Sequence, residues 1–366
     1  MKRLTLGDVC KKESSNIAQK NLQDKKGAYP IYGASGLIKQ VDFYQQDKEY
    51  IAVVKDGAGI GRTMLLPAYS SVIGTMQYLL PKEGIPIDIK YLFYAVEHMN
   101  LAKYFSGATI PHIYFRDYQK EPINIPDIET QRKISQIFGK IDALITSRKE
   151  QRTKLDQIVK SRFIEMFGEP DENPMGWEVT ELEHQLEIVG GFAFKSTGFT
   201  DSGIPVLRIG NINSGHFLSV NMVFWPNDPT LARYKMYPGD LVMSLTGTVG
   251  KDDYGNVCIL SDEYPEYYLN QRNAKLVIKT TMNKHYLSEL LKFSKIKKRL
   301  TGISRGVRQA NISNRDILAL CVPIPPIKLQ EQFADFVEQT DKSKYRQEKY
   351  IGFFQCLEKS IRQEWL

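Results

Sequence analysis

The residues of this chain whose types and spacing could do chemistry lie in one short polar stretch. Residues 302–313 include Arg305, Arg308 and Gln309 among small and amide side chains. An arginine can donate two parallel hydrogen bonds to guanine, and a glutamine or asparagine amide can pair in the same way with adenine. This stretch therefore has the composition of a loop that reads nucleic-acid bases.

The stretch follows a strongly basic segment. Residues 284–308 contain eight lysines and arginines and a single acid, Glu289, whereas the whole chain has a formal charge of +7. Clustered positive charge indicates a polyanionic partner, most simply nucleic acid, because phosphates that are neutralised by a protein release their counterions. The alternative interpretation is a basic helix face that only meets solvent.

A second candidate loop lies 199 positions upstream. Residues 107–114 align with residues 306–313 but carry Thr109 and His112 and no arginine. If the two loops share one backbone fold, their different side chains would imply different target sequences. Other polar residues are weaker candidates, for which an ordinary turn or a solvated surface is an equal alternative. The complete set of predicted DNA contacts is Lys55, Arg62, Thr109, His112, Lys195, Arg208, Asn211, Asn213, Lys251, Gln271, Arg272, Lys297, Lys298, Arg305, Arg308 and Gln309.

The candidate motifs for catalysis and for metal binding each depart from the residues or the spacing that such a motif requires. Residues 246–252 (TGTVGKD) resemble a phosphate-binding loop, but Leu245 stands where its first glycine should be and Asp252 replaces its Ser or Thr. The glycines of residues 57–62 (GAGIGR) have the wrong spacing for a dinucleotide site and favour a tight turn. The four cysteines and five histidines are scattered, without metal-ligand spacing. We therefore predict no catalytic residue and no metal ligand.

The composition is that of a soluble globular protein. The chain has 366 residues, of which 42% are hydrophobic, 11% aromatic and 25% charged. This length suits two or three domains. The N-terminal residues have no apolar signal core, and the longest apolar run, residues 317–327, is broken by prolines and too short for a membrane span. We therefore expect a cytoplasmic protein.

The chain contains a long internal duplication. Residues 123–142 (INIPDIETQRKISQIFGKID) and residues 322–341 (VPIPPIKLQEQFADFVEQTD) align without a gap at the same offset of 199, which pairs Pro126 with Pro325 and Gln131 with Gln330. The alignment continues upstream, where Ile113, Arg116 and Asp117 pair with Ile312, Arg315 and Asp316. A duplication of this length predicts two domains of one fold.

Each copy of the repeat is predicted to continue as a long helix. One covers about residues 128–167 and the other about residues 328–366, and both are apolar at their ends and polar in the middle. This layout indicates an antiparallel pair, whereas the alternative is that each helix only caps its own domain. The predicted spacer and partner positions are Ile134, Ile137, Ile141, Leu144, Leu155, Ile158, Phe333, Phe336, Val337, Tyr350, Phe354 and Leu357.

The blocks ahead of the two helices have a mixed character. Short β-type runs such as residues 49–54 and 76–81 alternate with glycine-rich turns, and a helical pattern covers residues 90–104. The second block repeats this order loosely. We therefore predict an α+β fold with two similar globular domains, residues 1–125 and 169–325, separated by two long antiparallel helices, residues 126–168 and 326–366, that form a coiled-coil-like spacer with pseudo-twofold symmetry.

Taken together, these segments identify a family. The chain resembles the specificity subunit of type I restriction-modification systems along essentially its whole length. The resemblance is carried by residues 190–196 (GGFAFKS), residues 203–212 (GIPVLRIGNI), residues 306–312 and the doubled Ile-Pro and Gln block that leads into each long helix. The first block has family-like segments at residues 29–36 and 56–61, but no arginine at the position of Arg308.

The resemblance implies two target recognition domains, each reading half of a split DNA site, and two helices that set their spacing and dock methylation subunits. The implied partners are double-stranded DNA, two methylation subunits and restriction subunits, with no membrane. It implies no catalysis and no cofactor in this chain, so S-adenosylmethionine, ATP and magnesium are expected on the partner subunits. The alternatives are a nuclease or adenine methyltransferase with an unrecognised active site, and an interaction scaffold built from duplicated domains.

Overall fold

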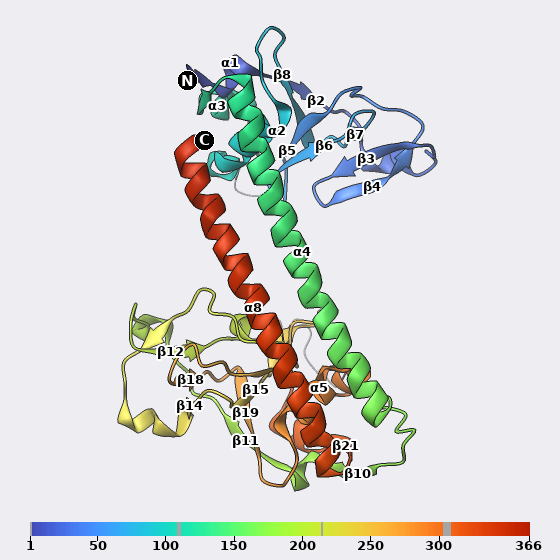
Figure 1. Cartoon of the computed structure of the whole chain (residues 1–366), viewed down its shortest axis with the longest axis vertical. Coiled ribbons are helices and arrows are strands. Elements are labelled where there is room, and N and C mark those ends of the chain that lie inside the picture. The colour runs from blue at the N-terminus through green and yellow to red at the C-terminus, as the bar shows by residue number, and fades with distance from the viewer. Residues whose placement is uncertain (1, 108–110, 214, 303–308) are drawn as a thin grey trace. The chain divides into compact units, whose positions relative to one another are not determined.

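The chain forms two compact units that share the long helices. The structure is a computed structural model and describes residues 2–107, 111–213, 215–302 and 309–366 (Figure 1). Unit 1 consists of Met1–Glu150 and Gln347–Leu366, and unit 2 consists of Gln151–Arg346. Each unit therefore contains one globular block, part of helix α4 (Ile128–Phe167) and part of helix α8 (Ile327–Trp365). The predicted boundaries at residues 125, 168 and 325 fall at the ends of these helices, whereas the compact units divide within them.

Unit 1 is built around a four-stranded antiparallel sheet in the order β2-β8-β5-β6. A three-stranded sheet, β4-β3-β7, and the pair β1-β9 complete its β structure. The elements are β1 (Lys2–Thr5), α1 (Leu6–Val9), β2 (Cys10–Ser14), β3 (Tyr29–Gly33), β4 (Gly36–Val41), β5 (Tyr50–Val54), β6 (Thr63–Leu66), β7 (Ser71–Val72), β8 (Met76–Pro81), α2 (Ile89–His98), α3 (Phe115–Tyr118) and β9 (Pro122–Ile125), with 3-10 turns at Gln19–Leu22 and Leu101–Tyr104.

Strand β5 is buried on both faces because successive side chains point to opposite sides of a sheet. Ile51 and Val53 pack in the core that includes helix α2, whereas Tyr50, Ala52 and Val54 pack in a separate core on the other face. The sequence YIAVV is apolar at every position and therefore suits a central strand.

Unit 2 repeats this architecture. Its four-stranded sheet has the order β11-β19-β15-β17, and the pair β10-β21 matches β1-β9. The elements are β10 (Glu178–Glu181), β11 (Leu186–Gly190), β12 (Ile204–Leu207), β13 (Phe224–Trp225), β14 (Lys235–Met236), β15 (Leu241–Ser244), β16 (Thr246–Thr248), β17 (Val257–Ile259), β18 (Tyr267–Leu269), β19 (Asn273–Ile278), α5 (Lys284–Lys292), α6 (Ser294–Thr301), β20 (Gln309–Asn311), α7 (Asn314–Leu318) and β21 (Cys321–Ile324), with 3-10 turns at Leu182–His184, Ser196–Gly198, Ile209–Asn211 and Pro229–Tyr234.

A buried glutamine ties each long helix to its own block. In unit 1, Gln131 accepts a hydrogen bond from the backbone N–H of Asp88 at 2.8 Å and donates to the carbonyl of Pro126 at 2.9 Å. In unit 2, Gln330 accepts from the N–H of Asn283 at 2.9 Å and donates to the carbonyl of Pro325 at 2.7 Å. Both glutamines are at most 1% exposed, so each satisfies backbone groups that would otherwise be buried without a partner.

A buried tyrosine repeats the pattern beside each glutamine. Tyr91 donates to the carbonyl of Asn124 at 2.6 Å, and Tyr286 donates to the carbonyl of Pro323 at 2.8 Å. Burial raises the pKa of both phenols, that of Tyr91 to about 12, so they remain protonated donors at neutral pH. The duplicated sequence therefore preserves a specific junction as well as a fold.

The buried stripe of helix α4 differs from the predicted one. Of the predicted positions, Ile134 and Ile141 are buried and Leu155 is partly buried, whereas Ile137, Leu144 and Ile158 are 41–49% exposed. The buried stripe is Ile134, Phe138, Ile141 and Ile145 in unit 1, followed by Val159, Phe163 and Phe167 in unit 2. Residues three or four positions apart lie on the same face of a helix, so more than one stripe of α4 fits the sequence pattern. Only the neighbouring core decides which stripe is covered.

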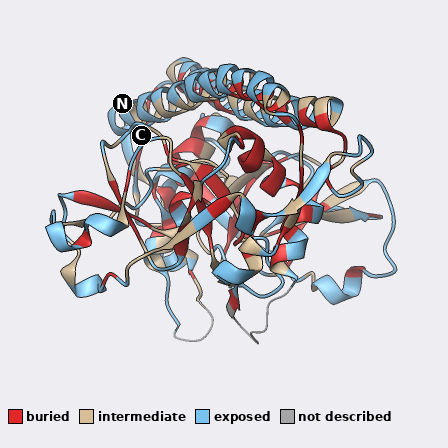
Figure 2. Ribbon diagram, turned by 90° about the horizontal axis from the view of Figure 1, so that it is seen from below, coloured by how far each residue is buried: buried red, intermediate tan, exposed pale blue. Residues whose placement is uncertain are grey.

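Helix α8 follows the prediction at its start and departs from it near its end. Phe333 and Val337 are buried, Phe336 and Phe354 are partly buried, and Tyr350 and Leu357 are exposed. Figure 2 shows exposed colour along much of both long helices and buried colour mainly on the strands and short helices of the globular blocks. Among the described residues, no helix is long and apolar enough to cross a membrane.

Within each unit the two helix segments run antiparallel. In unit 1, Arg148 of α4 donates to Gln347 of α8 at 3.2 Å, and Phe138 of α4 lies 5.2 Å from the guanidinium of Arg362. In unit 2, Lys344 of α8 pairs with Asp156 of α4 at 2.7 Å, and Phe333 packs on Phe163 with ring centres 5.3 Å apart. Unit 1 is therefore completed by a segment from the C-terminal end of the chain, whereas unit 2 is one continuous stretch with a helix segment at each end.

Candidate nucleic-acid interface

The first group of predicted contacts meets at one edge of a sheet in unit 2. Strands β12 and β18 are parallel neighbours, so their carboxyl ends lie at the same edge. Arg208 directly follows β12, and Gln271 and Arg272 follow β18. These three side chains line one cavity of about 470 Å³, and Lys195 precedes its lining residue Ser196. The sheet thus brings together residues that are about 60 positions apart in the sequence.

Asn211 lines the same cavity and also has a structural role, and its predicted role as a DNA contact stays a prediction. The residue is 1% exposed. Its amide group donates to the carbonyls of Leu218 and Val220 at 2.9 Å, and its side-chain oxygen accepts from the N–H of Arg208 at 2.9 Å. The amide group thus holds the following loop in place, and the side-chain oxygen caps the turn that begins after Arg208. The guanidinium of Arg208 also bonds the carbonyl of Asn221, which fixes its direction in the cavity.

A second group of predicted contacts lines a cavity of about 780 Å³ in unit 2. Asn213, Lys251, Lys297 and Lys298 all border this cavity, together with Lys292, which was not predicted. Lys297 is 8% exposed and is bound by groups of its own chain, and its predicted contact with DNA stays a prediction. Lys251 and Lys298 are exposed.

The described residues around the predicted base-reading stretch contact β16 and the loop that follows it in unit 2. Arg305 and Arg308 lie outside the described residues, and Gln309 is described only as the first backbone position of β20. Strand β20 pairs with β16, while Tyr254, just beyond β16, donates to the carbonyl of Thr301 at 2.8 Å. Thr301 and β20 are therefore both held by β16 and the loop that follows it.

Part of the basic charge of unit 2 is neutralised locally. Lys292 pairs with Glu289 at 2.6 Å, and Lys295 pairs with Glu172 at 3.2 Å. Lys284 donates to the carbonyl of Gly239 at 3.2 Å. These contacts lie on the flanks of helices α5 and α6. The positive charge that remains available to a polyanion is thus smaller than the number of lysines and arginines in residues 284–308.

The corresponding edge of unit 1 carries a different set of side chains. Asp56, which follows β5, accepts a hydrogen bond from His112 at 2.6 Å and pairs with Lys55. Burial would raise the pKa of Asp56, but the bonds from Lys55 and His112 outweigh it and hold the pKa below its ordinary value. Two predicted contacts, Lys55 and His112, are thus joined through one carboxylate.

His112 begins a short aromatic and basic array. Its ring stacks on Tyr114 with centres 6.4 Å apart, and the guanidinium of Arg116 lies 4.8 Å from the centre of the Tyr114 ring. Tyr114 and Arg116 are exposed. Arg62 is exposed and donates to the carbonyl of Ala34 at 2.8 Å, while Thr109 lies outside the described residues.

The sequence-based search missed a basic cavity in unit 1. A cavity of about 710 Å³ is lined by Lys11, Lys12, Lys55, Lys82 and Arg116, among other residues. Only Lys55 was predicted. Lys11 and Lys12 stand on edge strand β2, next to β8, and Lys82 directly follows β8. Their separation in the sequence hid the cluster, although two adjacent lysines on a short strand were a local signal.

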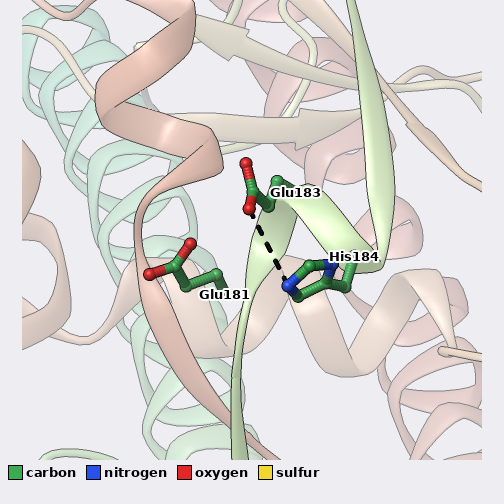
Figure 3. A group of neighbouring side chains, drawn as sticks. All are labelled: Glu181, Glu183 and His184. Atoms are coloured by element: carbon green, nitrogen blue, oxygen red, sulfur yellow. Dashed lines mark ion pairs between the residues drawn. The ribbon is translucent and has the colours of Figure 1, made fainter.

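One group of acids and histidine has the composition of a metal site. Figure 3 shows Glu181, Glu183 and His184 with their side chains close together, and Glu183 pairs with the His184 ring at 3.8 Å. All three residues are exposed, and hydrated surface carboxylates commonly gather in this way without a metal. We assign the group no metal role, and the prediction that this chain has no metal site stays a prediction.

Comparisons with known proteins agree on one family. The model of the type I restriction modification DNA specificity domain matches residues 1–157 and 174–351. The MjaVIII specificity subunit of a type I restriction enzyme from Methanocaldococcus jannaschii is 26% identical over 311 residues, which cover 80% of this chain and 72% of that protein. The EcoKI specificity subunit from Escherichia coli K12 is 22% identical over 188 residues, which cover 48% of this chain and 39% of that protein.

A solved structure has the same fold. The crystal structure of the S subunit of a type I restriction-modification system from M. genitalium aligns with a TM-score of 0.59 at 15% identity and covers 100% of this chain and 96% of that one. The two segments that the family model matches each include one globular block and the first part of the long helix that follows it.

Proposed function

Because the chain belongs to the type I restriction-modification DNA specificity family, we propose that its two units each read one half of a bipartite DNA site. The chain is the DNA-recognition subunit of such a system and not a catalytic one, and it works with methylation and restriction subunits. Beyond this family role, we propose that the chain reads two half-sites and that the residues described above read them.

One observation carries this proposal: the two units share a frame and differ at its exposed edge. Gln131 and Gln330 make the same two buried hydrogen bonds, one in each unit. At the edge, unit 1 presents Lys55, His112 and other groups, whereas unit 2 presents amide and arginine side chains such as Gln271 and Arg272. A common frame with different polar edges is suited to two different base sequences, because base contacts specify sequence while phosphate contacts position the protein.

We assign the two long helices to spacing and docking. Helix α4 has 40 residues and helix α8 has 39, so each is about 60 Å long. Exposed apolar side chains, such as Ile137 and Ile158 on α4 and Phe353 on α8, offer contact area for protein partners. The near-symmetric repeat supports a partner complement of two methylation subunits, one for each copy. S-adenosylmethionine, ATP and magnesium would bind those partner subunits.

The test is co-expression of the chain with its methylation subunit, followed by mapping of the modified adenines. A split target sequence that is modified only when this chain is present supports the proposal. Arg272→Ala should relax one half-site and Arg62→Ala the other, with a cost of about 1–3 kcal/mol at the affected bases. Lys279→Ala is the matched control, since Lys279 is an exposed cation outside the cavities described above that pairs with Glu187 at 3.0 Å. Relaxation of both half-sites by one variant would contradict the assignment of one half-site to each unit.

The spacer assignment has its own test. Four residues, about one helical turn, are inserted after Glu150 in α4 and after Arg346 in α8, where the two compact units divide. The modified half-sites should keep their sequences while the number of unspecified base pairs between them changes. Unchanged spacing in a complex that still methylates DNA would rule out the spacer role.

A further inference from the structure

The cavity of about 780 Å³ in unit 2 has an excess of positive charge. Its lining includes Lys251, Lys292, Lys297 and Lys298, and among the described lining residues the single acid is Asp252. The cavity lies between helix α6 and the loop that connects β16 with β17. It also borders Thr301, which directly precedes the predicted base-reading stretch, and Gly302, which is the first residue of that stretch.

Lys297 is the most deeply placed of these lysines. Its side chain is 10% exposed. The ammonium group donates to the side-chain oxygen of Asn256 at 2.6 Å and forms an ion pair with Asp252. Asn256 in turn donates to the side-chain oxygen of Asn213 at 3.4 Å. A buried ammonium needs an anionic partner, because removal of its hydration costs several kcal/mol.

The two partners of this ion pair have opposite environments. The side chain of Asp252 is 87% exposed, in contrast to 10% for Lys297. The loop around Asp252 contains two glycines in the left-handed region, Gly250 with φ of 78° and Gly255 with φ of 68°. A carboxylate that keeps most of its hydration loses little when it leaves the lysine, whereas the lysine then requires another anion.

We propose that this cavity binds a backbone phosphate of DNA and that Asp252 is a built-in counter-ion, which holds Lys297 until the phosphate replaces it. The inference rests on the proposed function and adds a regulating contact to it. A DNA phosphate offers the charge and the acceptor oxygens that Lys297 then needs, and the neighbouring Lys251 and Lys298 are exposed to meet the same strand. The phosphate would lie next to the base-reading stretch and would position that stretch without specifying sequence.

The role of the counter-ion follows from competition. While Asp252 neutralises Lys297, an unspecific phosphate gains less from this cavity than from a free ammonium. DNA that is also held by base contacts stays long enough to displace the carboxylate. Asp252 therefore lowers binding to unrelated sequences more than it lowers binding to the target.

The experiment compares Asp252→Asn with Asp262→Asn in the full chain assembled with its methylation subunits. Both changes remove one negative charge, but Asp262 is exposed and does not line the cavity. Binding to a duplex of unrelated sequence is measured from low to moderate salt. Asp252→Asn should bind about fivefold more tightly than Asp262→Asn at low salt, and its log affinity should fall with log salt more steeply by about 0.9.

Lys298→Gln tests the same cavity by removing a positive charge instead of a negative one. The loss of this exposed lysine should weaken binding to unrelated duplex and make the salt dependence shallower by about 0.9. Thermal unfolding confirms that each variant is folded. Equal affinities for Asp252→Asn and Asp262→Asn would overturn the proposal, and so would weaker binding by Asp252→Asn.

The failure of this inference differs from the failure of the proposed function. If the inference is wrong, Asp252→Asn behaves like its control while the complex still methylates a split target. If the proposed function is wrong, the unchanged chain directs no methylation to any split target. In the expected case, Asp252→Asn methylates the same target but with a smaller preference over unrelated sequences.

Discussion

Units 1 and 2 are alike where they are buried and different where they are exposed. The glutamine junction is the same in both, down to the two backbone groups that it bonds. At the sheet edge, unit 1 joins Lys55, Asp56 and His112, whereas unit 2 has a two-stranded sheet that pairs β16 with β20. Buried contacts tolerate little change because a lost partner leaves a polar group unsatisfied, while exposed loops can diverge.

The units also differ in how the long helices enter their cores. In unit 2, Phe163 is at the centre of an aromatic cluster with Phe167, Tyr286, Phe293 and Phe333. In unit 1, Phe138 packs against one tyrosine, Tyr94, and against the guanidinium of Arg362. Unit 2 thus relies on aromatic packing and unit 1 on a mixed aromatic and ionic contact.

The largest effect is expected at these aromatic positions. Phe163→Ala should lower the free energy of unfolding of unit 2 by about 3–5 kcal/mol, because it removes a fully buried ring and leaves a cavity. Phe138→Ala should do the same to unit 1. Denaturant unfolding of the full chain measures both. Ile158→Ala is the control, since Ile158 is 49% exposed and its loss should change stability by about 0.5 kcal/mol or less. A similar cost at Ile158 would refute the buried stripe described above.

The second test compares the glutamine junctions of the two units. Gln131→Leu and Gln330→Leu each remove the partner of one backbone N–H and one carbonyl, and Gln131→Leu also removes the 3.2 Å bond to the carbonyl of Pro86, so each should cost about 2–4 kcal/mol of stability. The two costs should agree within about 1 kcal/mol, a margin within which matched contacts in different surroundings can vary. Gln157→Leu on the exposed surface of α4 is the control. A large cost at one junction and none at the other would break the proposed equivalence of the units.

Arg362 tests the contribution of the C-terminal helix segment to unit 1. Its guanidinium bonds Glu97 and Glu358, each at 2.6 Å, and the carbonyl of Tyr94 at 3.2 Å. Arg362→Met keeps an unbranched apolar stem but removes these bonds, and it should destabilise unit 1 by about 1–3 kcal/mol. Hydrogen exchange can separate the units: protection of α2 should fall, while protection of α5 in unit 2 should not change. Equal loss in both units would mean that the contact is not local.

The smallest effect on stability is expected at Asp56 of unit 1. The pKa of Asp56 is held below its ordinary value by Lys55 and His112, so the stability that it contributes is present above about pH 4 and is lost as the pH falls through the lowered pKa. The stability difference between the wild-type chain and Asp56→Asn should therefore shrink below about pH 4. Denaturant unfolding at several pH values between about 3 and 6 measures it. A difference that stays constant over this range would show that the paired carboxylate does not stabilise unit 1.

Several features of the molecule were predictable from the sequence because they depend on local patterns. The offset of 199 residues, the two long helices and the repeated Gln131 and Gln330 are visible without a structure. The paired cavity residues Gln271 and Arg272 were also identified as candidate contacts from their types alone. In each case, residue type, spacing or repetition within the chain carried the information.

Other features were decided by the tertiary structure. Asn211 and Lys297 were nominated as DNA contacts by residue type, and only the structure shows that Asn211 is bound by the following loop and that Lys297 is buried against Asn256. The basic cavity of unit 1 collects Lys11, Lys82 and Arg116 from three separate elements.

The sequence by itself determined that this chain is a duplicated α and β protein with polar, basic loops suited to DNA. Periodicity and repetition are local properties, so they survive without knowledge of the fold. The tertiary structure alone decided which face of α4 is covered, with Phe138 inside and Ile137 outside. Burial and hydrogen-bond partners depend on residues far away in the chain, and for that reason residue type could nominate the DNA contacts but could not separate them from the residues that hold the loops.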